Sequence, residues 1–582
     1  MVDSVRPEGF GGAAHCAMGG SLRPEVVKMS DRSRDSVNRT EGRATPAAPD
    51  VRAQWHQWAL SRRSLLKTSL AGVAAAAMAN GGALPIRSVA AAAQDDATPV
   101  AGGSLYMSLA DDDVQSFDPI IPTDNMSIWT MLLIYDQLIR VAPDGVSLEA
   151  GLAETWEISD DFLTYTFHLR DATWHDGSAV TAADAAFSIT RAATDEKSTW
   201  ASMITVIKSA EAKDDKTLVI TLNSVWAPFE ADLALFACSI IPKAAYESQK
   251  DKLFDKPIGS GPFVFDSWNK GSEIVLKKNA SYWEAGKPYL DELHFMVLTD
   301  ANARMLQFQG GDLDVVTAVP YSQIESLKSN PDVVVLRDAV ARTDYVMINN
   351  GRDPWSDKNL RQAINYAVDK DTLLANVLFG NGKMANTFLP LMAGHTDDVV
   401  GYPFDLDKAK ELVAQSKGKD GFKGELLIAS GDTVGDQIAQ IIASQLKEIG
   451  GEITVTAMEG AARREKVRVK GDYDFNIGYY TTDIIDPDEL TTFVVVSAEG
   501  GIAGYSKYKN EEVDKLATQA AQEHDWATRE KTYAQIQQLH SDDAPMIFLF
   551  YPTGGVATSS AVQNFKVLPT GNYRLWDTWK KA

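Results

Sequence analysis

The sequence predicts an α/β protein of two lobes with mixed sheets. Residues 163–297 contain short segments in which apolar and polar residues alternate, the period of two that is typical of half-buried strands. From about Tyr345, apolar runs are separated by longer segments with helical spacing. An apolar run near the end of the chain indicates one more strand, which we expect to return to the first lobe. The predicted extents are residues 94–342 and 544–582 for the first lobe, and residues 343–543 for the second.

Alternating strands and capped helices predict the first lobe. In residues 163–169, Leu, Tyr, Phe and Leu alternate with Thr, Thr and His, which predicts a half-buried strand. Thr181 followed by Asp184 is a capping box and predicts a helix that runs to about Ala193. Further strands are expected at 218–222, 274–276 and 293–297, and a helix capped by Asp300 is expected to end at Gly310 and Gly311.

The second lobe is predicted to contain a βαβ unit. Apolar residues 426–429 and 453–455 flank a segment of helical spacing, 434–449, that Gly450 ends. A strand, a helix and a strand in this order indicate a parallel pair. Another strand is expected at 475–480, and two helices, 511–522 and 526–540, precede the final strand at 546–550.

Composition and charge exclude several classes of protein. The 582 residues are 45% hydrophobic and 23% charged, as in ordinary globular proteins. With 56 Lys and Arg against 79 Asp and Glu, the net charge of −23 repels nucleic-acid phosphates, so we expect no nucleic-acid partner. Cys16 lies in the expected leader and Cys238 outside it, so one mature chain cannot form a disulfide or a cysteine-based metal site. Apolar neighbours suit Cys238 to a core position.

The first 93 residues are typical of an export leader. Arg62 and Arg63 precede an uncharged Ala- and Gly-rich stretch, 68–86, and then a zone of small residues, 88–93. This order indicates a secretory signal, and the paired arginines resemble a twin-arginine export signal. The alternative is a transmembrane anchor, for which the stretch is too Gly-rich and too weakly apolar. Removal of the leader leaves 489 residues with 44 basic and 72 acidic side chains, a net charge of −28.

No catalytic or metal-binding motif is apparent. The sequence has no phosphate-binding loop, no zinc-protease helix motif and no nucleophile-elbow motif. His168 and His175 are close in sequence, but their strand-and-turn setting indicates an exposed pair rather than a metal site. We therefore expect no catalytic residues, no metal and no cofactor. Because catalytic triads assemble in space without a sequence signature, a secreted hydrolase stays as an alternative.

Aromatic residues next to polar ones indicate a small-molecule pocket. Aromatic walls with a few placed polar groups suit a small ligand. Asp483 follows a predicted strand, where open α/β sheets place ligand-binding groups. The candidate ligand-binding residues are Asp483, Tyr480, Thr481, Tyr479, Asn125, Tyr345 and Asn349. The alternatives are that Trp129 and Tyr345 are core aromatics, and that Asp483 is a turn-former or a helix cap.

Several motifs occur in an order that resembles a known family. They include Phe-Asp-Pro at 117–119, Gly-Leu-Ala-Glu-Thr-Trp at 151–156, Trp-His-Asp-Gly at 174–177 and Pro-Ile-Gly-Ser-Gly-Pro-Phe at 257–263. With these motifs the chain resembles the extracellular solute-binding proteins of ABC transporters, in the family typified by oligopeptide-, dipeptide- and nickel-binding members. The resemblance implies a periplasmic-binding-protein fold of two lobes around a hinge, with a small extra subdomain at about 144–225. It also implies a ligand that is enclosed as the lobes close.

The resemblance carries over one site residue and puts another in doubt. In peptide-binding relatives an aspartate in a D-x-x-[DE]-P setting holds the ligand's α-ammonium group, and residues 483–487 are similar to it. Dipeptide binders clamp the ligand carboxylate with an arginine, and the matching segment here, 430–434, has none. Ile484 and Ile485 also replace the small polar residues of the dipeptide motif. A longer peptide, or a cationic or neutral solute such as an oligosaccharide, fits these departures better; so few histidines give nickel chelates little support.

The sequence thus predicts an exported solute receptor without enzymatic activity. It is expected in the periplasm or at the outer face of the cytoplasmic membrane, as a monomer that delivers a peptide to an ABC permease. An oligosaccharide or another solute is the alternative ligand, and a secreted hydrolase is the alternative of another class.

Overall fold

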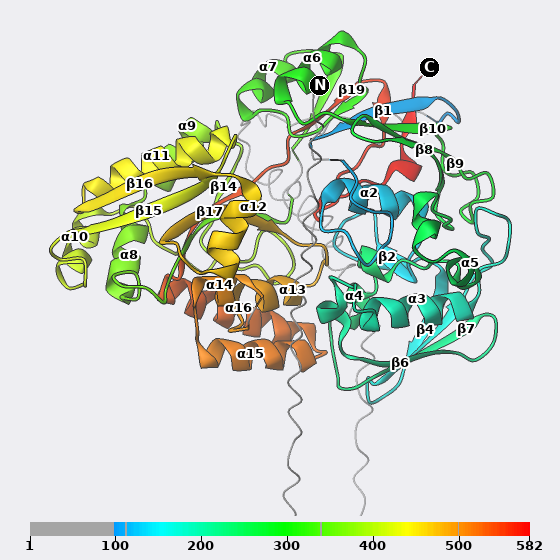
Figure 1. Ribbon diagram of the computed structural model, residues 1–582, viewed down its shortest axis with the longest axis horizontal. Helices are drawn as coiled ribbons and strands as arrows, with labels where there is room; N and C mark the ends of the chain where they lie inside the picture. The colour runs from blue at the N-terminus through cyan, green and yellow to red at the C-terminus, as the bar shows by residue number, and fades with distance from the viewer. Residues whose placement is uncertain (1–97, 111–112, 338–339, 499, 582) are drawn as a thin grey trace, which may run out of the picture. The chain divides into compact units, whose positions relative to one another are not determined.

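A computed structural model describes residues 98–110, 113–337, 340–498 and 500–581 (Figure 1). The expected leader, residues 1–93, lies outside these residues. The described chain contains three sheets of four or more strands, with helices packed against them, which confirms an α/β fold with mixed sheets. In the described part of the chain no helix is both long enough and apolar enough to cross a membrane.

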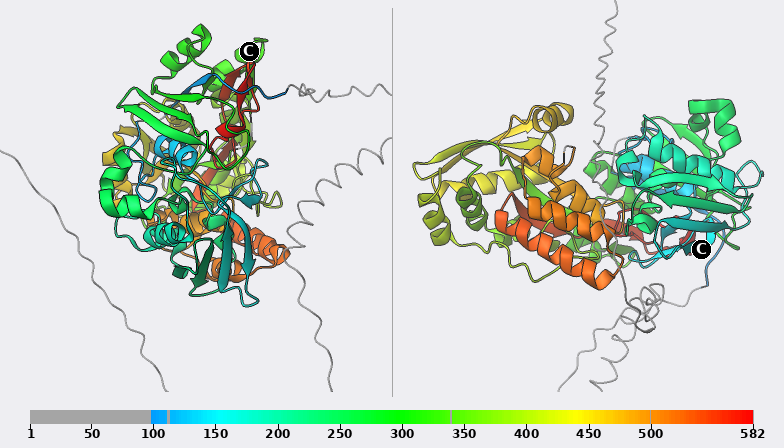
Figure 2. Two further views of the ribbon diagram at one scale, coloured as in Figure 1. Left: turned by 90° about the vertical axis from the view of Figure 1, so that its right-hand side faces the viewer. Right: turned by 90° about the horizontal axis from the view of Figure 1, so that it is seen from below.

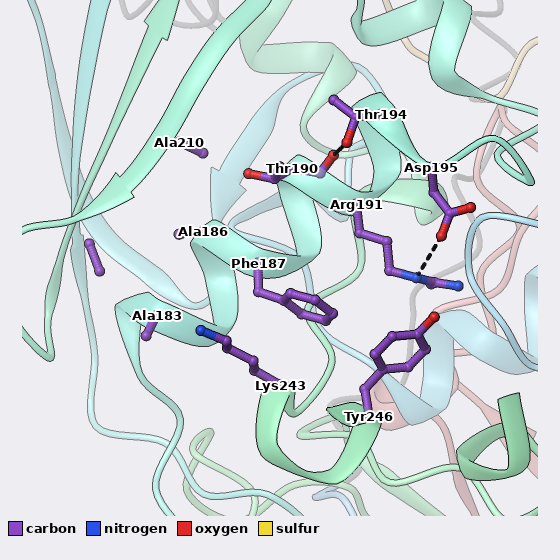
Figure 3. Close-up of a pocket in the computed structure, with 11 residues that line it drawn as sticks. Ala183, Ala186, Phe187, Thr190, Arg191, Thr194, Asp195, Ala210, Lys243 and Tyr246 are labelled. Carbon is purple, nitrogen blue, oxygen red and sulfur yellow. Dashed lines mark hydrogen bonds and ion pairs between the residues drawn. The ribbon is translucent and has the colours of Figure 1, made fainter. Parts of the chain in front are cut away.

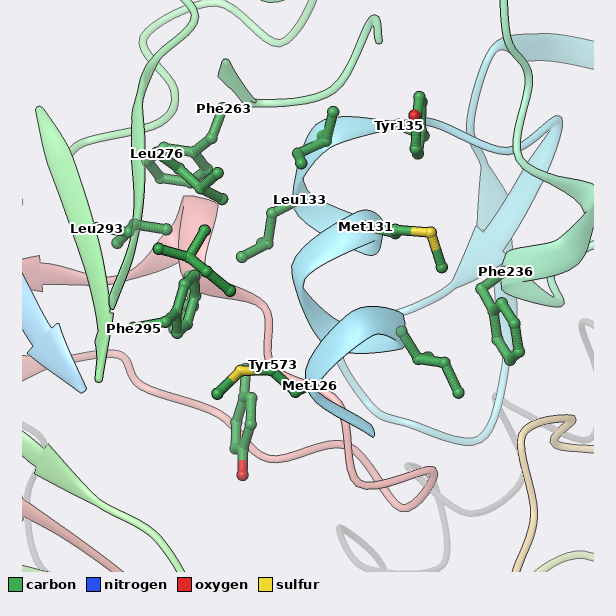
Figure 4. Packing of buried hydrophobic residues seen from close by; sticks show 14 of the residues in the cluster. Met126, Met131, Leu133, Tyr135, Phe236, Phe263, Leu276, Leu293, Phe295 and Tyr573 are labelled. Carbon is green, nitrogen blue, oxygen red and sulfur yellow. The ribbon is translucent and has the colours of Figure 1, made fainter. Parts of the chain in front are cut away.

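A seven-stranded mixed sheet forms the first lobe, in the order β12-β19-β11-β1-β10-β9-β8. Its strands are β1 (Ser104–Leu109), β8 (Phe263–Asn269), β9 (Glu273–Lys278), β10 (Glu292–Val297), β11 (Val315–Val316), β12 (Val333–Leu336) and β19 (Val556–Ser559). Helix α2 (Asn125–Ile134) packs on this sheet, and Figure 4 shows Leu133 of α2 facing Leu276 and Phe295 of the strands. Helices α6 (Ala301–Gly310) and α7 (Ile324–Lys328) belong to a smaller core beside it.

A smaller antiparallel sheet, in the order β4-β5-β7-β6, has a core of its own. It comprises β4 (Ala153–Ile158), β5 (Thr164–Leu169), β6 (Ile207–Ala212) and β7 (Thr217–Leu222), and α3 (Ala182–Thr194) packs on it. The predicted strands 163–169 and 218–222 coincide with β5 and β7. Cys238 is fully buried in the same core, as expected from its apolar neighbours.

The capping box at the start of α3 is confirmed and predicts the effect of a substitution. The Thr181 hydroxyl accepts from the Asp184 amide, and the Asp184 carboxylate accepts from the Thr181 amide at 2.9 Å. We expect Thr181→Ala to lower the free energy of unfolding by about 1 kcal/mol, because the Asp184 amide loses the hydroxyl as an acceptor and the Asp184 carboxylate loses the hydroxyl as a donor. Urea unfolding measures the change. Thr194→Ala, which removes a hydroxyl bonded within the same helix, is the matched control and should change it less; equal losses would contradict the prediction.

A six-stranded mixed sheet, β14-β18-β13-β17-β15-β16, forms the second lobe. Its strands are β13 (Arg342–Ile348), β14 (Gly382–Met384), β15 (Phe422–Ala429), β16 (Gly451–Met458), β17 (Phe475–Thr481) and β18 (Met546–Pro552). β15 and β16 are parallel and α11 (Thr433–Lys447) connects them, which confirms the predicted βαβ unit.

Helices cover both faces of the six-stranded sheet. One face packs against α8 (Lys358–Ala367), α9 (Lys370–Val377), α10 (Leu406–Ala414) and α11. The other packs against α14 (Ile502–Ser506), α15 (Glu511–Gln522) and α16 (Trp526–Asp543). Figures 1 and 2 show α15 and α16 side by side on this second face. Along β13, Val346 and Ile348 point towards α8 to α11 on one face of the sheet. Tyr345 and Met347 point towards α14 to α16 on the other face.

The expectation that strand 546–550 returns to the first lobe is wrong. These residues form β18, which pairs with β13 and β14 in the sheet of the second lobe. Every residue of β18 is buried, because helices cover both faces of this sheet. A strand buried on both faces is a continuous apolar run, and such a run does not reveal which sheet it joins. The chain rejoins the first sheet only at β19, which pairs with β11 and β12.

The prediction of an exposed histidine pair is wrong for one of its two members. His168 is exposed on β5, but the His175 ring lies between two backbone groups, the Gly259 amide at 3.2 Å and the Gly261 carbonyl at 3.1 Å. Burial lowers the pKa of His175 to about 4. Its ring therefore holds the 259–261 turn as a neutral hydrogen-bonding group.

Candidate functional site

The ends of several strands meet at one edge of the six-stranded sheet. β15 runs parallel to both β16 and β17, so the loops after all three strands leave from the same edge. β13 is antiparallel to β17, with Arg342 opposite Thr481, so β13 begins at this edge. Because β12 lies in the first sheet and β13 in the second, the chain passes from one lobe to the other here. Asp483 follows β17 at the same edge, where open α/β sheets bind their ligands.

The last part of β17 has one free side. β17 pairs with β13 along its whole length, but it pairs with β15 only at Phe475 and Asn476. In the described chain no strand pairs with Gly478 to Thr481 on the β15 side. In the described chain the backbone donors and acceptors on this side are therefore not used by a neighbouring strand. Tyr479, 57% exposed, and the exposed Thr481 belong to this stretch.

Asp483 is a half-buried carboxylic acid at the end of this open stretch. Burial raises the pKa of its carboxyl group to about 6. The described residues provide no hydrogen-bond donor to its carboxylate, although its backbone amide donates to Glu489 at 3.0 Å. A carboxylate that is partly removed from water and has no protein partner is suited to bind a cationic group of a ligand.

Buried acidic residues surround Asp483 in the loop that follows β17. Asp486 forms a bidentate pair with Arg529 of α16, with N–O distances of 2.9 and 2.8 Å. Burial, and then the charge of Asp486, raises the pKa of Asp488 to about 7. Burial, and then the charge of Asp483, raises the pKa of Glu489 to about 8. Among the described residues, the acidic side chains of this loop therefore outnumber the one arginine that pairs with them, and burial favours the neutral form of Asp488 and Glu489.

The first lobe contacts this acidic loop through α4 (Phe229–Asp232). Asp232 is 4% exposed, and its carboxylate accepts a hydrogen bond from the Trp226 indole at 2.8 Å. Burial, and then the charges of Asp488 and Asp486, raises the pKa of Asp232 well above its usual value. The Ala227 amide also donates to the Ala521 carbonyl of the second lobe at 2.7 Å. The acidic loop and α15 thus form part of the contact between the two lobes.

The raised pKa of Asp488 predicts that the effect of Asp488→Asn on the free energy of unfolding depends on pH. Asp488 binds its proton more tightly in the folded protein than in the unfolded chain, so the stability that this proton provides is present below pH 4 and is lost as the pH rises towards 7. An asparagine has no proton to lose. We expect the free energy of unfolding of the variant, relative to the original protein, to rise from pH 4.5 to pH 7.5 in urea unfolding. A stability difference between Asp488→Asn and the original protein that does not change with pH would contradict this prediction.

Two predicted aromatic residues lie in the core. Tyr480 is 5% exposed and its hydroxyl donates to the Phe388 carbonyl at 2.7 Å. The ring of Tyr345 is equally buried, 5.2 Å from the Tyr480 ring. Tyr345 therefore lies in the core, as the alternative interpretation predicted. Tyr479 points to the other side of β17, and the Arg342 guanidinium lies 3.8 Å from its ring centroid.

Asn349 lies away from Asp483, and Asn125 makes no hydrogen bond to it in the described chain. Asn349 follows β13 at the Phe475 end of β17, so the length of the strand separates it from Asp483. Its side chain donates to the Gly471 and Tyr473 carbonyls and accepts from the Gly351 amide. These hydrogen bonds connect loops at the edge of the sheet opposite to Asp483. Asn125 begins α2 in the first lobe, and in the described chain no hydrogen bond joins it to Asp483.

A separate hollow of about 540 Å³ lies between α3, α5 (Lys243–Gln249) and β6 (Figure 3). Alanines of α3 line it together with Phe187 and Tyr246. Arg191 at its edge is already paired with Asp118, at 2.7 and 2.6 Å, and with Asp195, at 3.4 Å. None of the candidate ligand-binding residues lines this hollow.

Sequence reasoning did not find Glu489, Asp232 or Arg529. Each stands in a segment whose pattern predicts ordinary packing, and only the folded chain brings the three together. The available signal is an acidic residue inside an apolar stretch, as at Asp232 in 229–241 and Glu489 in 484–496. Such a residue is rarely buried without a partner or a specific role.

A half-buried carboxylate at the carboxyl ends of parallel strands, in a two-lobed α/β chain, is placed where such sheets bind ligands and indicates a ligand-binding protein. The model of the bacterial extracellular solute-binding proteins, family 5, matches residues 147–501. The chain belongs to this family. Members of the family bind solutes and are not enzymes, which sets the secreted hydrolase aside.

Individual relatives agree with this assignment. The probable D,D-dipeptide-binding periplasmic protein DdpA of Escherichia coli is 31% identical over 470 residues, which cover 78% of this chain and 90% of DdpA. The periplasmic binding protein DppA of Helicobacter pylori, solved with the peptide STSA, has a TM-score of 0.74 at 29% identity and covers 83% of this chain and 99% of its own. The oligopeptide-binding protein AppA of Bacillus subtilis, solved with a nonapeptide, has a TM-score of 0.73 at 27% identity and covers 83% of this chain and all of its own.

Proposed function

We propose that this protein binds a peptide between its two lobes and delivers it to an ABC permease. The observation that carries the proposal is Asp483, a half-buried carboxylate to which the described residues provide no hydrogen-bond donor, next to the side of β17 on which no described strand pairs. The peptide complexes of the related DppA and AppA support the same class of ligand.

The site offers two kinds of contact that a peptide can use. An extended peptide can add to the free side of Gly478 to Thr481 through main-chain hydrogen bonds, which do not depend on its sequence. Its α-ammonium group can pair with Asp483, an interaction that strengthens as closing lobes exclude water. Together these contacts favour a peptide with a free amino terminus over a solute that lacks one.

An oligosaccharide is the second candidate ligand. The exposed Tyr479 favours it, because sugar rings stack on aromatic faces. The Arg342 guanidinium occupies one face of this ring, which leaves only the other face for a sugar. A neutral sugar has no charge that can pair with the Asp483 carboxylate, whereas a peptide has an ammonium group. A peptide therefore accounts for more of the site.

The route and the location of the protein complete the proposal. The paired Arg62 and Arg63 support export by the twin-arginine route, followed by removal of residues 1–93. The receptor then acts as a monomer in the periplasm or at the outer face of the cytoplasmic membrane. The periplasmic relatives and the family support this location.

Calorimetry on residues 94–582 tests the proposed ligand. The titrants are random-sequence peptides of two to nine residues, the same peptides with acetylated amino termini, and a set of neutral oligosaccharides. We expect binding of the free peptides and weak or no binding of the acetylated ones. Binding of oligosaccharides without any response to peptides would overturn the proposal in favour of the second candidate.

A further inference from the structure

We propose that Glu489, holding a proton, positions Asp483 for its ligand and keeps the site at a single negative charge. This inference rests on the proposed role of Asp483 as the ligand-binding carboxylate. Glu489 does not itself touch the ligand in this proposal. It acts through the backbone amides of Asp483 and Ile484 and the side-chain hydroxyl of Thr482, and it thereby selects ligands with one ammonium group at this point.

Glu489 holds three consecutive residues with one oxygen atom. Its Oε2 accepts from the Asp483 amide at 3.0 Å and from the Ile484 amide at 2.8 Å. The same oxygen forms a short hydrogen bond with the Thr482 hydroxyl. Glu489 is buried, so water does not compete for these contacts. The backbone conformation that presents Asp483 at the sheet edge therefore depends on this one side chain.

The hydrogen bonds of Thr482 indicate that Glu489 carries a proton. The Thr482 hydroxyl lies 2.5 Å from the Ile484 carbonyl oxygen as well as next to Glu489 Oε2. A hydroxyl has one proton to donate, and both of these neighbours are acceptors if Glu489 is ionised. A protonated Glu489 satisfies both contacts, because it donates to the hydroxyl and the hydroxyl donates to the carbonyl. An ionised Glu489 would leave two buried acceptors facing each other without a proton between them.

The charges near Glu489 also favour its protonated form. The charges that act on Glu489 directly are Asp483 on its own loop and Asp232 on α4. Its loop neighbours Asp486 and Asp488 face Arg529 and Tyr533 of α16. Arg529 is the one cation among them, and it is bound to Asp486. Among the described residues no further cation faces Asp483 and Glu489, so a second negative charge there would be unpaired.

The proton on Glu489 sets the charge that a ligand meets. With Glu489 neutral, the Asp483–Glu489 pair has one negative charge when Asp483 is ionised, which matches one ammonium group. With both groups ionised, the pair would have two charges and would favour a dication. The site is therefore built for a single amino terminus, and Glu489 acts as a specificity-determining residue.

Affinity measurements on four variants test this inference. The probe is a random-sequence tetrapeptide mixture with free amino termini, measured against the same mixture after acetylation. We expect Glu489→Ala to weaken binding of the free mixture at least tenfold, and Glu489→Gln, which keeps a neutral acceptor, to restore it to within about threefold. Asn350→Ala is the matched control, because the Asn350 side chain also makes three hydrogen bonds, to backbone carbonyls at the opposite edge of the sheet. It should leave the affinity unchanged.

The fourth variant, Asp483→Asn, distinguishes a failure of this inference from a failure of the proposed function. If the original protein does not bind the free mixture, the proposed function is wrong. If it binds and Asp483→Asn leaves the affinity unchanged, Asp483 does not hold the amino terminus and the inference about Glu489 falls with it. If Asp483→Asn weakens binding while Glu489→Ala behaves like Asn350→Ala, the positioning role is wrong and the proposed function stands.

A measurement without ligand tests the proton itself, and it also decides the case if Glu489→Ala does not fold. The protein is labelled with ¹³C at glutamate carboxyl carbons, and Glu489→Gln assigns the signal. We expect the Glu489 carboxyl signal to show a protonated acid at pH 6.5. A signal that titrates near pH 4.5 would overturn the proton assignment.

Discussion

Replacing Asp483 by asparagine is expected to reduce the affinity for peptides with a free amino terminus by about 30-fold or more. The loss of one partner of a desolvated, hydrogen-bonded charge pair costs about 2–5 kcal/mol, and 1.4 kcal/mol corresponds to a factor of ten. Asparagine has nearly the shape of aspartate, so the hydrogen bond from the Asp483 amide to Glu489 stays possible. The change therefore acts on the charge and not on the fold.

Three comparisons make this result specific to the ammonium group. Calorimetry with acetylated peptides should show the same weak binding for Asp483→Asn and for the original protein, because neither pairs a charge there. Asp472→Asn places the same substitution in an exposed surface ion pair before the other end of β17, and it should leave the affinity unchanged. Asp483→Asn with the affinity of Asp472→Asn would show that the ligand's amino terminus lies elsewhere.

Patterns along the chain predict local structure well here because local contacts decide it. The capping box of Thr181 and Asp184, the glycine after α6 and the βαβ unit of β15, α11 and β16 each involve residues close in sequence. Asp483 could also be found, because its position after a strand and its resemblance to a family motif both mark it. These signals need no knowledge of which sheet a strand joins.

Sequence patterns do not show which segments that are distant in the chain lie together in the fold. Strand 546–550 is apolar on both faces, so its sequence fits either lobe, and only the pairing with β13 decides. Asn349 stands four residues after Tyr345, but an extended strand carries it to the other edge of the sheet. Glu489 reaches back to the Asp483 loop only because α13 (Asp488–Leu490) turns the chain. Nearness in sequence to an aromatic residue is thus a poor guide to a site.

Replacing Arg529 by methionine is expected to lower the free energy of unfolding at pH 7.5 by about 3–5 kcal/mol. Arg529 is 2% exposed and makes a bidentate pair with Asp486, and it also donates to the Ala520 carbonyl at 3.0 Å. Removing one member of a buried ion pair leaves the other as an uncompensated charge. Here the remaining charge faces Asp488 and Asp232, so the cost is raised by like charges.

The pH dependence of this loss distinguishes charge from packing. Without the arginine, Asp486 and its acidic neighbours can avoid repulsion by binding protons, which are more available at low pH. The destabilisation measured by urea unfolding should therefore be smaller at pH 5 than at pH 7.5. The double variant Asp486→Asn with Arg529→Met should recover part of the stability at pH 7.5, since it removes the orphaned charge as well. An equal loss at both pH values, with no recovery in the double variant, would mean that Arg529 stabilises the acidic loop only by filling space.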